Sequence, residues 1–559
     1  MKRNMPRRNI FAALTLAVLV AACAVPAPSP PAVVAVANPP PVAATNPDPG
    51  IVLVGKVVPM NDAGDVWPGA RVWMRGGVIE AVAKAGEALP EAASKARVIE
   101  TGGVIYPGMI DLHNHPEYAI YPLMPIPRAY KDRYEWRFYD EAYNQRITYP
   151  AVVLQNADYF NLAMEIGRYG EYKALVGGTT SLQGGRTNLP YSTSECLVRN
   201  IENSKVGARL AFSRVDIGRD AVEWANLLKE KNSGMLVVHL AEGPSTRMAG
   251  EYEAIKKSGL VGPELIAIHG VGLTENQFKD MAGQGAKMVW SPLSNFLLYA
   301  TTANVAAAKR AGVSISLAPD WGPSGSKSIL GELKVADLVN RHQLKNLFSD
   351  RELAEMVTRT PARAMGWAER AGQIAPGFVA DIVVMDDRAP DAYRNLIEAI
   401  EENVRLVSVR GELLYGDQPL LAQTPGLESA ITFGSRTKML APNCAGTSLP
   451  VMSLAETRAR LQRGLNMDAE FLLAQMQAKP EAQKKMIAEL GRCPGGSPAG
   501  ALTAEDTKRF LSCRFKLPYE NTTLSPLATS QDAAWMTRLL ANPNIPAYLK
   551  ALPDYYRKQ

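Results

Sequence analysis

Between residues 106 and 371, short apolar runs alternate with amphipathic segments of helical periodicity. The runs read IYPGMIDLHNH, LVGGTTSL, ARLAFSRV, MLVVHLAEG, LIAIHGVGL, AKMVWSPLSN and VSISLAP. Strands that alternate with helices over about 260 residues are typical of a parallel (β/α)₈ barrel, which usually takes about 250 residues. The sequence therefore predicts an α/β fold with a TIM-type (β/α)₈ barrel at residues 106–371. Seven strands are evident, and we expect the eighth somewhere within residues 190–235.

Two β-rich stretches flank this barrel. Residues 51–105 and 372–420 contain short β-like runs separated by turns, among them IVLVGKVV and VRLVSVRGELLYGD. They predict a small β-sandwich domain built from segments on either side of the barrel. Beyond residue 420 the pattern turns helical, with TRARLQRGLNMDAEFLLAQM as its best amphipathic stretch. We expect residues 421–559 to form a mainly helical C-terminal extension.

The first 23 residues have the anatomy of an export signal. A basic start precedes an apolar stretch at residues 10–22, which is too short to span a bilayer comfortably. It ends in Val20-Ala21-Ala22-Cys23, which resembles the lipobox of bacterial lipoproteins, where the cysteine is lipidated. We therefore expect residues 1–23 to be a lipoprotein signal peptide with lipid attached at Cys23. The alternative is an ordinary cleaved signal with an incidental cysteine.

Residues 24–50 are dominated by Pro, Ala and Val, a composition that favours an extended, structureless tether. The expected location is the periplasmic face of the bacterial cell envelope, with the membrane contacted only through the N-terminal lipid. In that oxidising compartment the remaining cysteines could pair. A weak hypothesis joins Cys493 to Cys513, with Cys444 as a rival partner and Cys196 also available.

The charge balance does not indicate a nucleic-acid partner. The chain carries a formal net charge of +6, and four of the positive charges lie in the expected leader. The remaining balance is close to neutral, and a strong basic excess is what nucleic-acid binding requires.

Four of the five histidines lie at the ends of the apolar runs, on the face where barrel enzymes build their active sites. His113 and His115 share strand parity with Asp111, so alternation points all three to one face. His239 ends MLVVH and His269 ends LIAIH.

A lone His-x-His pair is usually incidental, but Asp320 directly follows VSISLAP, and no cysteine joins the set. Together these residues favour a metal that prefers nitrogen and oxygen ligands over a structural thiolate site. The fifth histidine, His342, lies in a helical context, and we interpret it as structural.

Such a metal lowers the pKa of bound water and so produces hydroxide near neutral pH. Hydroxide attacks an sp² carbon that carries a nitrogen leaving group, and that nitrogen then needs a proton from a positioned acid. Glu242 follows His239 by three residues. On a regular strand it would face away, so the strand must break at Leu240-Ala241, as the following Gly243-Pro244 allows.

The segments PGMIDLHNH, HLAEG, IHGVGL, WSPLSNFLLY and PDWGPSGSKSILGELKVADL resemble the amidohydrolase superfamily, in its deaminase and chlorohydrolase branch. GQIAPGFVADIVV resembles the closing β-sandwich strand of that family, and the resemblance covers roughly residues 51–420. It implies one divalent metal ion, zinc or iron, with zinc favoured. The residues that match the family's metal ligands are His113, His115, His239 and Asp320. Among the catalytic positions, Glu242 matches the proton shuttle and His269 orients the hydroxide or the developing charge.

Some relatives hold two metals bridged by a carboxylated lysine on an earlier strand. No lysine lies inside an apolar run between residues 174 and 238. Lys205, Lys229 and Lys231 stand in polar or helical surroundings, which favours the one-metal site.

The loop from Pro116 to Phe160 is far longer than the usual 2–6 residues of a βα connection. Residues 118–160 hold 11 of the chain's 40 aromatic residues, which suits either a lid over a flat ligand or a small helical insert with its own core. Asn295, Trp321 and Lys327, near the last strand ends, are predicted to line the substrate pocket.

We therefore expect a metal-dependent hydrolase that acts on a carbon–nitrogen bond other than a peptide bond, by deamination or by opening a cyclic amide. Its partner would be a small-molecule substrate, cyclic or aromatic. Two alternatives stay open. One is a hydrolase that releases another leaving group, such as chloride, and the other is a binding lipoprotein that has lost turnover.

Overall fold

The computed structural model describes residues 48–184, 197–204, 206–207, 210–214, 221–442, 452–467, 469–481, 483–485, 507–508, 510–512 and 522–557. The expected signal peptide, most of the tether and all five cysteines, including Cys23 and the Cys493–Cys513 pair, lie outside these residues. In the part that is described, no helix combines the length and the apolar character needed to cross a bilayer.

A nine-stranded sheet joins the two flanking β-rich stretches. The order of its strands is β16-β17-β15-β14-β13-β4-β1-β2-β3. Strand β4 pairs with β13, and in this pair Ile105 lies directly opposite Val384. The strands are β1 (Ile51–Val57), β2 (Trp67–Arg75), β3 (Val78–Ala83), β4 (Arg97–Pro107), β13 (Ile382–Asp386), β14 (Val404–Val409), β15 (Glu412–Asp417), β16 (Glu428–Phe433) and β17 (Arg436–Leu440). The hydrogen bonds describe one sheet, and β16 and β17 extend it past residue 420, into the extension that is expected to be mainly helical. The β-sandwich stays a prediction.

Among the described residues, eight further strands run parallel in two sheets. The first sheet holds β5 (Met109–Asp111), β6 (Thr179–Leu182) and β7 (Arg199–Asn200). The second holds β8 (Leu210–Arg214), β9 (Gly234–Leu240), β10 (Leu265–His269), β11 (Lys287–Trp290) and β12 (Ile315–Leu317). An isolated parallel bridge between Asn114 and Asp320 connects the outer edge of β12 to that of β5. The unexpectedly short β7 is the eighth strand.

Alternation along these strands creates two apolar layers. One face of the strands packs against helices in the main hydrophobic core. From the other face, side chains of several strands join a separate buried cluster, which includes Ile110, Val237, Ile268 and Val289, together with Ala318 just after β12. The strands therefore enclose an apolar interior below their carboxyl ends.

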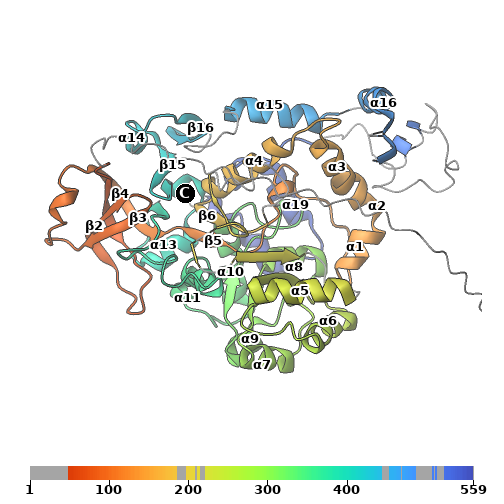
Figure 1. The fold of residues 1–559 in the computed structure, drawn as a ribbon, viewed down its shortest axis with the longest axis horizontal. Helices are drawn as coiled ribbons and strands as arrows, with labels where there is room; N and C mark the ends of the chain where they lie inside the picture. The colour runs from red at the N-terminus through yellow and green to blue at the C-terminus, as the bar shows by residue number, and fades with distance from the viewer. Residues whose placement is uncertain are drawn as a thin grey trace, which may run out of the picture. The chain divides into compact units, whose positions relative to one another are not determined.

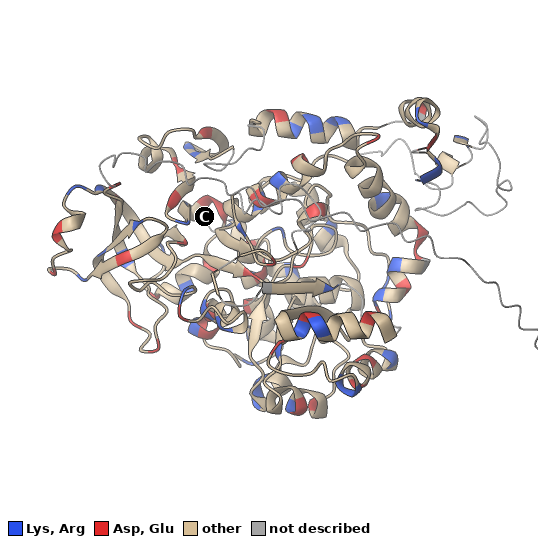
Figure 2. Cartoon of the chain, viewed as in Figure 1, with Lys and Arg blue, Asp and Glu red and all other residues tan. Residues whose placement is uncertain are grey.

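Helices connect successive strands and cover their outer face (Figure 1). The helices between the parallel strands are α4 (Ala163–Val176), α5 (Ala221–Ser233), α6 (Thr246–Lys257), α7 (Glu275–Gly283), α8 (Pro292–Tyr299) and α9 (Val305–Ala311). Three more helices follow β12, namely α10 (Ile329–His342), α11 (Asp350–Glu355) and α12 (Arg359–Ala364), and α13 (Ala392–Glu398) lies between β13 and β14. Basic and acidic residues are interspersed along the outer helices α5, α6 and α7 (Figure 2), as expected for solvated helix faces.

The long loop after β5 is a helical insert. It contains η2 (Pro116–Tyr118), α1 (Arg133–Tyr139), α2 (Glu141–Tyr143), the π-turn η3 (Asn144–Thr148) and α3 (Tyr149–Gln155). Asp132 caps α1 by accepting a hydrogen bond from the Tyr134 N–H. Buried aromatic side chains of the insert, such as Trp136 and Tyr149, belong to the main core, so the insert is packed onto the strands and does not form a separate core.

The last part of the chain lies against the same unit. It contains α14 (Gln418–Leu421), α15 (Leu454–Leu465), α16 (Ala469–Ala478), η5 (Thr529–Gln531), α19 (Ala533–Ala541), η6 (Ala547–Ala551) and α20 (Asp554–Arg557). The Ser525 N–H donates to the carbonyl of Ile120 at 3.0 Å, and Asn544 Nδ2 donates to the carbonyl of Leu297 at 2.8 Å. The C-terminal segment therefore contacts both the insert and α8.

Candidate functional site

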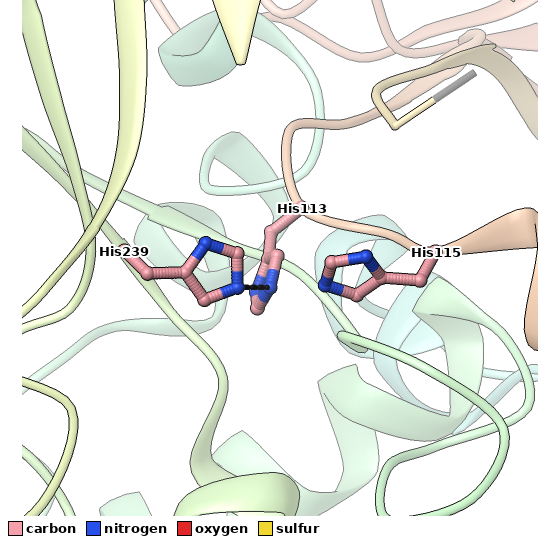
Figure 3. A group of neighbouring side chains, drawn as sticks. All are labelled: His113, His115 and His239. Atoms are coloured by element: carbon pink, nitrogen blue, oxygen red, sulfur yellow. Dashed lines mark hydrogen bonds between the residues drawn. The ribbon is translucent and has the colours of Figure 1, made fainter. Parts of the chain in front are cut away.

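The carboxyl ends of three strands bring four histidines together. His113 and His115 follow β5, His239 lies in β9 and His269 ends β10. His113 lies at the centre of the group, and its ring centroid is 4.8–5.4 Å from those of the other three. Figure 3 shows the rings of His113, His115 and His239 converging from opposite sides. His115 is the one most open to solvent, with a side chain 17% exposed.

Hydrogen bonds at Nδ1 determine which nitrogen two of these histidines direct inward. His239 Nδ1 lies 3.2 Å from the carbonyl oxygen of Arg214, and His269 Nδ1 lies 2.9 Å from Asn295 Oδ1. Both partners accept, so each Nδ1 carries the hydrogen and each Nε2 keeps its lone pair. His113 Nδ1 is held by the Ser291 hydroxyl at 2.9 Å.

Asp320, which lies three residues after the end of β12, adds a carboxylate to the group of histidines. Its Oδ1 lies 3.1 Å from His113 Nε2 and 3.5 Å from His115 Nε2. The other oxygen accepts a hydrogen bond from the Ser294 hydroxyl at 2.5 Å. Burial raises the pKa of this carboxyl group.

At the centre of this group of four histidines and Asp320, hydrogen-bond acceptors outnumber hydrogen-bond donors. Burial lowers the pKa of His113 and of His269 to about 3 and also lowers that of His239, so these rings are neutral. Even so, His113 Nε2 and His239 Nε2 lie only 3.2 Å apart, and the buried His269 Nε2 has no hydrogen-bond partner among the residues that the structure describes. Nitrogens bound to a tetrahedral zinc ion stand about 3.3 Å apart. The donor set therefore fits a divalent cation, and three overlapping groups of these residues have ligand atoms within 4.8 Å of one another.

Left-handed backbone at three non-glycine residues turns the side chains into the site. Ala241 has φ of 52°, and His269 and Asp320 each have φ of 70°. β9 ends at Leu240, so the turn at Ala241 is the strand break that the spacing of His239 and Glu242 requires. At His269 the turn reverses alternation, because Leu265 and Ala267 of the same parity pack outward in the main core. Such backbone costs about 1–2 kcal/mol per residue, so the surroundings must hold it in place.

Glu242 lies beside the histidines and is buried. Its Oε1 is 3.7 Å from His269 Nε2 and accepts a hydrogen bond from the Tyr299 hydroxyl at 2.6 Å. Burial raises the pKa of Glu242 to about 8, although the nearby Arg133 guanidinium acts in the opposite direction. A carboxyl group that titrates near neutral pH can both take up and deliver a proton.

Aromatic side chains of the insert cover one side of the site. Trp321 follows Asp320, and its ring lies 6.1 Å from that of His115. Tyr118, Trp136 and Tyr143 of the insert pack on Trp321 with centroid distances of 5.1, 5.7 and 6.0 Å. The wall next to His115 is therefore aromatic, as the composition of the insert predicts.

The other predicted pocket residues lie in different places. Asn295 holds His269, and Trp321 belongs to the aromatic wall. Lys327 lines a small cavity of about 20 Å³ that Asp111 and Trp321 also line. Its ammonium group, however, is bonded to the C-terminal segment, 2.5 Å from both Asp532 Oδ2 and Ser525 Oγ.

Sequence reasoning missed the part played by helix α8. Four side chains of this helix, counting its N-cap Ser291, each form a hydrogen bond with a different residue of the site. The pairs are Ser291 with His113, Ser294 with Asp320, Asn295 with His269 and Tyr299 with Glu242. The signal was present in WSPLSNFLLY, because positions 291, 295 and 299 share one helix face.

Residues 215–414 match the model of the amidohydrolase family. That segment contains His239, Glu242, His269 and Asp320, whereas the His113–His115 pair lies before it. This part of the chain is therefore similar to the amidohydrolase family.

Two relatives of similar sequence are both described as 5-methylthioadenosine/S-adenosylhomocysteine deaminases. A 5-methylthioadenosine/S-adenosylhomocysteine deaminase of Pyrococcus abyssi is 26% identical over 202 residues, 34% of this chain and 47% of that protein. The alignment thus spans about half of that relative's length. A protein of the same description from Symbiobacterium thermophilum is 23% identical over 440 residues, 66% of this chain and 93% of its own.

A solved structure shares the fold. It is an adenosine deaminase from Xanthomonas campestris with bound zinc, 19% identical, and the similarity covers 65% of this chain and 92% of that one with a TM-score of 0.50. The likeness supports an amidohydrolase-type fold for the unit that carries the histidines.

Proposed function

We propose that this protein is a metal-dependent hydrolase that acts on a carbon–nitrogen bond other than a peptide bond, of the deaminase type. The observation that carries the proposal is the convergence of four strand-end histidines, Asp320 and Glu242 in one buried site with surplus lone pairs. Relatives described as deaminases and the amidohydrolase match at residues 215–414 support it.

His113, His115, His239 and Asp320 would hold one divalent ion, zinc in preference to iron. When bound, such an ion acts as a Lewis acid that activates water near neutral pH. Asn295 holds the His269 ring so that Nε2 faces the site, where it can accept a hydrogen bond or face developing charge. Glu242 takes a proton from the attacking water and returns it to the leaving nitrogen, which then departs as ammonia or as an amine.

The aromatic wall favours a flat, cyclic substrate. Stacking on Trp321 and the neighbouring tyrosines would place a heteroaromatic ring beside His115, with its exocyclic nitrogen directed towards Glu242. A ring-bound amino group is therefore the substrate feature that we expect first, and a cyclic amide is the second.

Export and lipid attachment at Cys23 belong to the same proposal. The lipobox-like Val20-Ala21-Ala22-Cys23 and the proline-rich residues 24–50 support it. The enzyme would then work on small molecules at the periplasmic face of the envelope.

A direct test combines metal analysis with a substrate panel. Protein purified with zinc should contain about one ion per chain and should release ammonia from at least one member of a panel of aminopurines, aminopyrimidines and cyclic amides. Chelation should abolish the activity, and added zinc should restore it. Failure of a metal-loaded preparation to release ammonia or to open any ring in the panel would contradict the proposal.

A further inference from the structure

We infer that Tyr299 is a positioning residue that orients Glu242, and that Trp136 of the insert holds Tyr299 in place. This inference rests on the proposed function, because it assigns Glu242 a role in proton transfer. Its starting observation is a chain of two hydrogen bonds among buried side chains. Trp136 Nε1 donates to the Tyr299 hydroxyl at 2.9 Å, and that hydroxyl donates to Glu242 Oε1 at 2.6 Å.

The chemistry of the groups determines the direction of both bonds. An indole N–H can only donate, so the tyrosine oxygen accepts from Trp136. The single hydroxyl hydrogen of Tyr299 is then left for Glu242, and Oε1 accepts it. Because Oε1 accepts this hydrogen and also lies 3.7 Å from His269 Nε2, the bond fixes the orientation of the carboxyl group beside the histidines. Tyr299 therefore holds the proton carrier in one orientation.

The insert also holds the main chain at this point. The Arg133 N–H, at the start of α1, donates to the Glu242 carbonyl at 3.1 Å. The Arg133 guanidinium makes two hydrogen bonds to Glu251, at 2.7 and 3.0 Å, and Glu251 in turn accepts from the Ala241 N–H at 2.9 Å. The left-handed turn that places Glu242 is thus fastened to the same helix that carries Trp136.

Trp136 in turn depends on how the insert is docked. Its ring packs on Tyr143 with a centroid distance of 4.9 Å and on Trp321 at 5.7 Å. Trp321 also borders His115. Trp136 therefore contacts both the aromatic wall and the Tyr299 hydroxyl that is bonded to Glu242.

Tyr299→Phe is the central variant, because it removes one oxygen and keeps the ring. On a substrate identified with the panel, kcat should fall about 10- to 100-fold, the loss expected for one hydrogen bond to a charged group. KM and metal content should stay within about twofold, because the variant leaves the metal ligands and the aromatic wall intact. A residue that merely supports the fold would change metal content, KM and kcat together.

Tyr252→Phe is the matched control. Tyr252 also donates its hydroxyl to a carboxylate at 2.6 Å, but its partner is Asp280 and both lie on the outer helices α6 and α7. This variant should leave kcat unchanged. Trp136→Phe should lower kcat less than Tyr299→Phe, and the double variant should have the kcat of Tyr299→Phe alone, because the indole N–H reaches Glu242 only through Tyr299. KM is expected to rise in both Trp136 variants, because Trp136 packs on Trp321 in the aromatic wall.

A readout without turnover separates this inference from the proposed function. In protein labelled with ¹⁵N-tryptophan, the indole N–H resonance that disappears in Trp136→Phe should shift in Tyr299→Phe and stay in place in Tyr252→Phe. An unshifted resonance, or a Tyr299→Phe enzyme with wild-type kcat, would overturn the positioning role while leaving a measured deaminase activity standing. A shifted resonance in a metal-loaded protein without turnover would overturn the proposed function and, with it, the role in proton transfer.

Discussion

The Asp320 N–H donates to the carbonyl oxygen of His113 at 3.1 Å, so two of the proposed ligands are joined through their main chains as well as through their side chains. The bond lies where the last parallel strand meets the first, next to the bridge between Asn114 and Asp320. The position of the carboxylate relative to the His113–His115 pair is therefore set by strand pairing.

Replacing Asp320 with alanine should lower metal content and activity together. The carboxylate is the anionic member of the proposed ligand set, and its loss leaves a divalent charge in a buried site with only neutral rings. Elemental analysis and steady-state rates on the same preparation measure both effects. Asp387→Ala is the control, because that exposed aspartate pairs only with Lys56 among the ion pairs of the described residues. An Asp320→Ala protein with full metal content would contradict the ligand assignment.

Glu242→Gln should separate metal binding from chemistry. The substitution keeps the side-chain size and leaves the ligands untouched, so about one ion per chain should remain. It removes the proton carrier, and general acid–base catalysis is typically worth about 10²–10⁴-fold, so turnover should fall by at least that range. Glu253→Gln, on the outer helix α6, serves as the control. Near-normal turnover in Glu242→Gln, or two ions in the wild-type chain, would overturn the assignment.

Lys327→Met should act on stability more than on substrate binding. The ammonium is buried with Asp532 and Ser525, and the substitution would leave the Asp532 carboxylate buried without its partner. Breaking a buried pair in this way costs about 3–5 kcal/mol in the free energy of unfolding. Denaturant titration measures the loss, and Lys279→Met, at an exposed i,i+4 pair with Glu275, should cost less than about 1 kcal/mol. A raised KM with unchanged stability would instead support the pocket role predicted from the sequence.

Glu171 should make the fold less stable as the pH rises. It is buried on α4, and burial raises its pKa to about 7, above the usual value of 4.5. The folded state therefore binds more protons than the unfolded state between about pH 4.5 and 7, and the stabilising contribution declines across that window. At about 1.4 kcal/mol per pH unit, the loss approaches about 3 kcal/mol.

Glu171→Gln cannot ionise, so its free energy of unfolding should fall less steeply over the same window. The comparison must be made as a difference between the two proteins, because burial also raises the pKa of Glu332 to about 8. Equal slopes for wild type and variant from pH 4.5 to 7 would show that Glu171 does not contribute.

Cys23→Ser should release the protein from membranes. Fractionation of cells that produce each form, together with the mass of the wild-type N-terminal peptide, measures attachment. A variant that still fractionates with membranes, and a wild-type peptide without added lipid mass, would remove the anchor from the proposal.

Much of the site could be predicted because its side chains follow apolar runs. β5, β9 and β10 coincide with runs that end near His113, His239 and His269, and parallel strands bring their carboxyl ends together. The eighth strand could not be identified, because β7 spans only Arg199–Asn200 and a two-residue strand has no alternation to detect.

Other features depend on contacts between distant segments. Lys327 stands near a strand end, which suggested the pocket, but its partner Asp532 lies in a C-terminal segment with no periodic signal that links the two. The orientation of the His269 side chain could not be predicted from the sequence either. Its strand parity would direct the ring outward, and only the left-handed φ of 70° turns it to the other histidines.

The pairing of β4 with β13 has a consequence for biosynthesis. Ile105 and Val384 are direct partners, so one edge of β4 stays without its neighbour until nearly 280 further residues have been made. At about 5–20 residues per second, that interval lasts roughly 15–60 s. An uncovered strand edge invites pairing with other chains, so the nascent chain would need a holding chaperone during this time. Depletion of such chaperones should affect the yield of this protein before it affects that of proteins whose sheets pair between neighbouring segments.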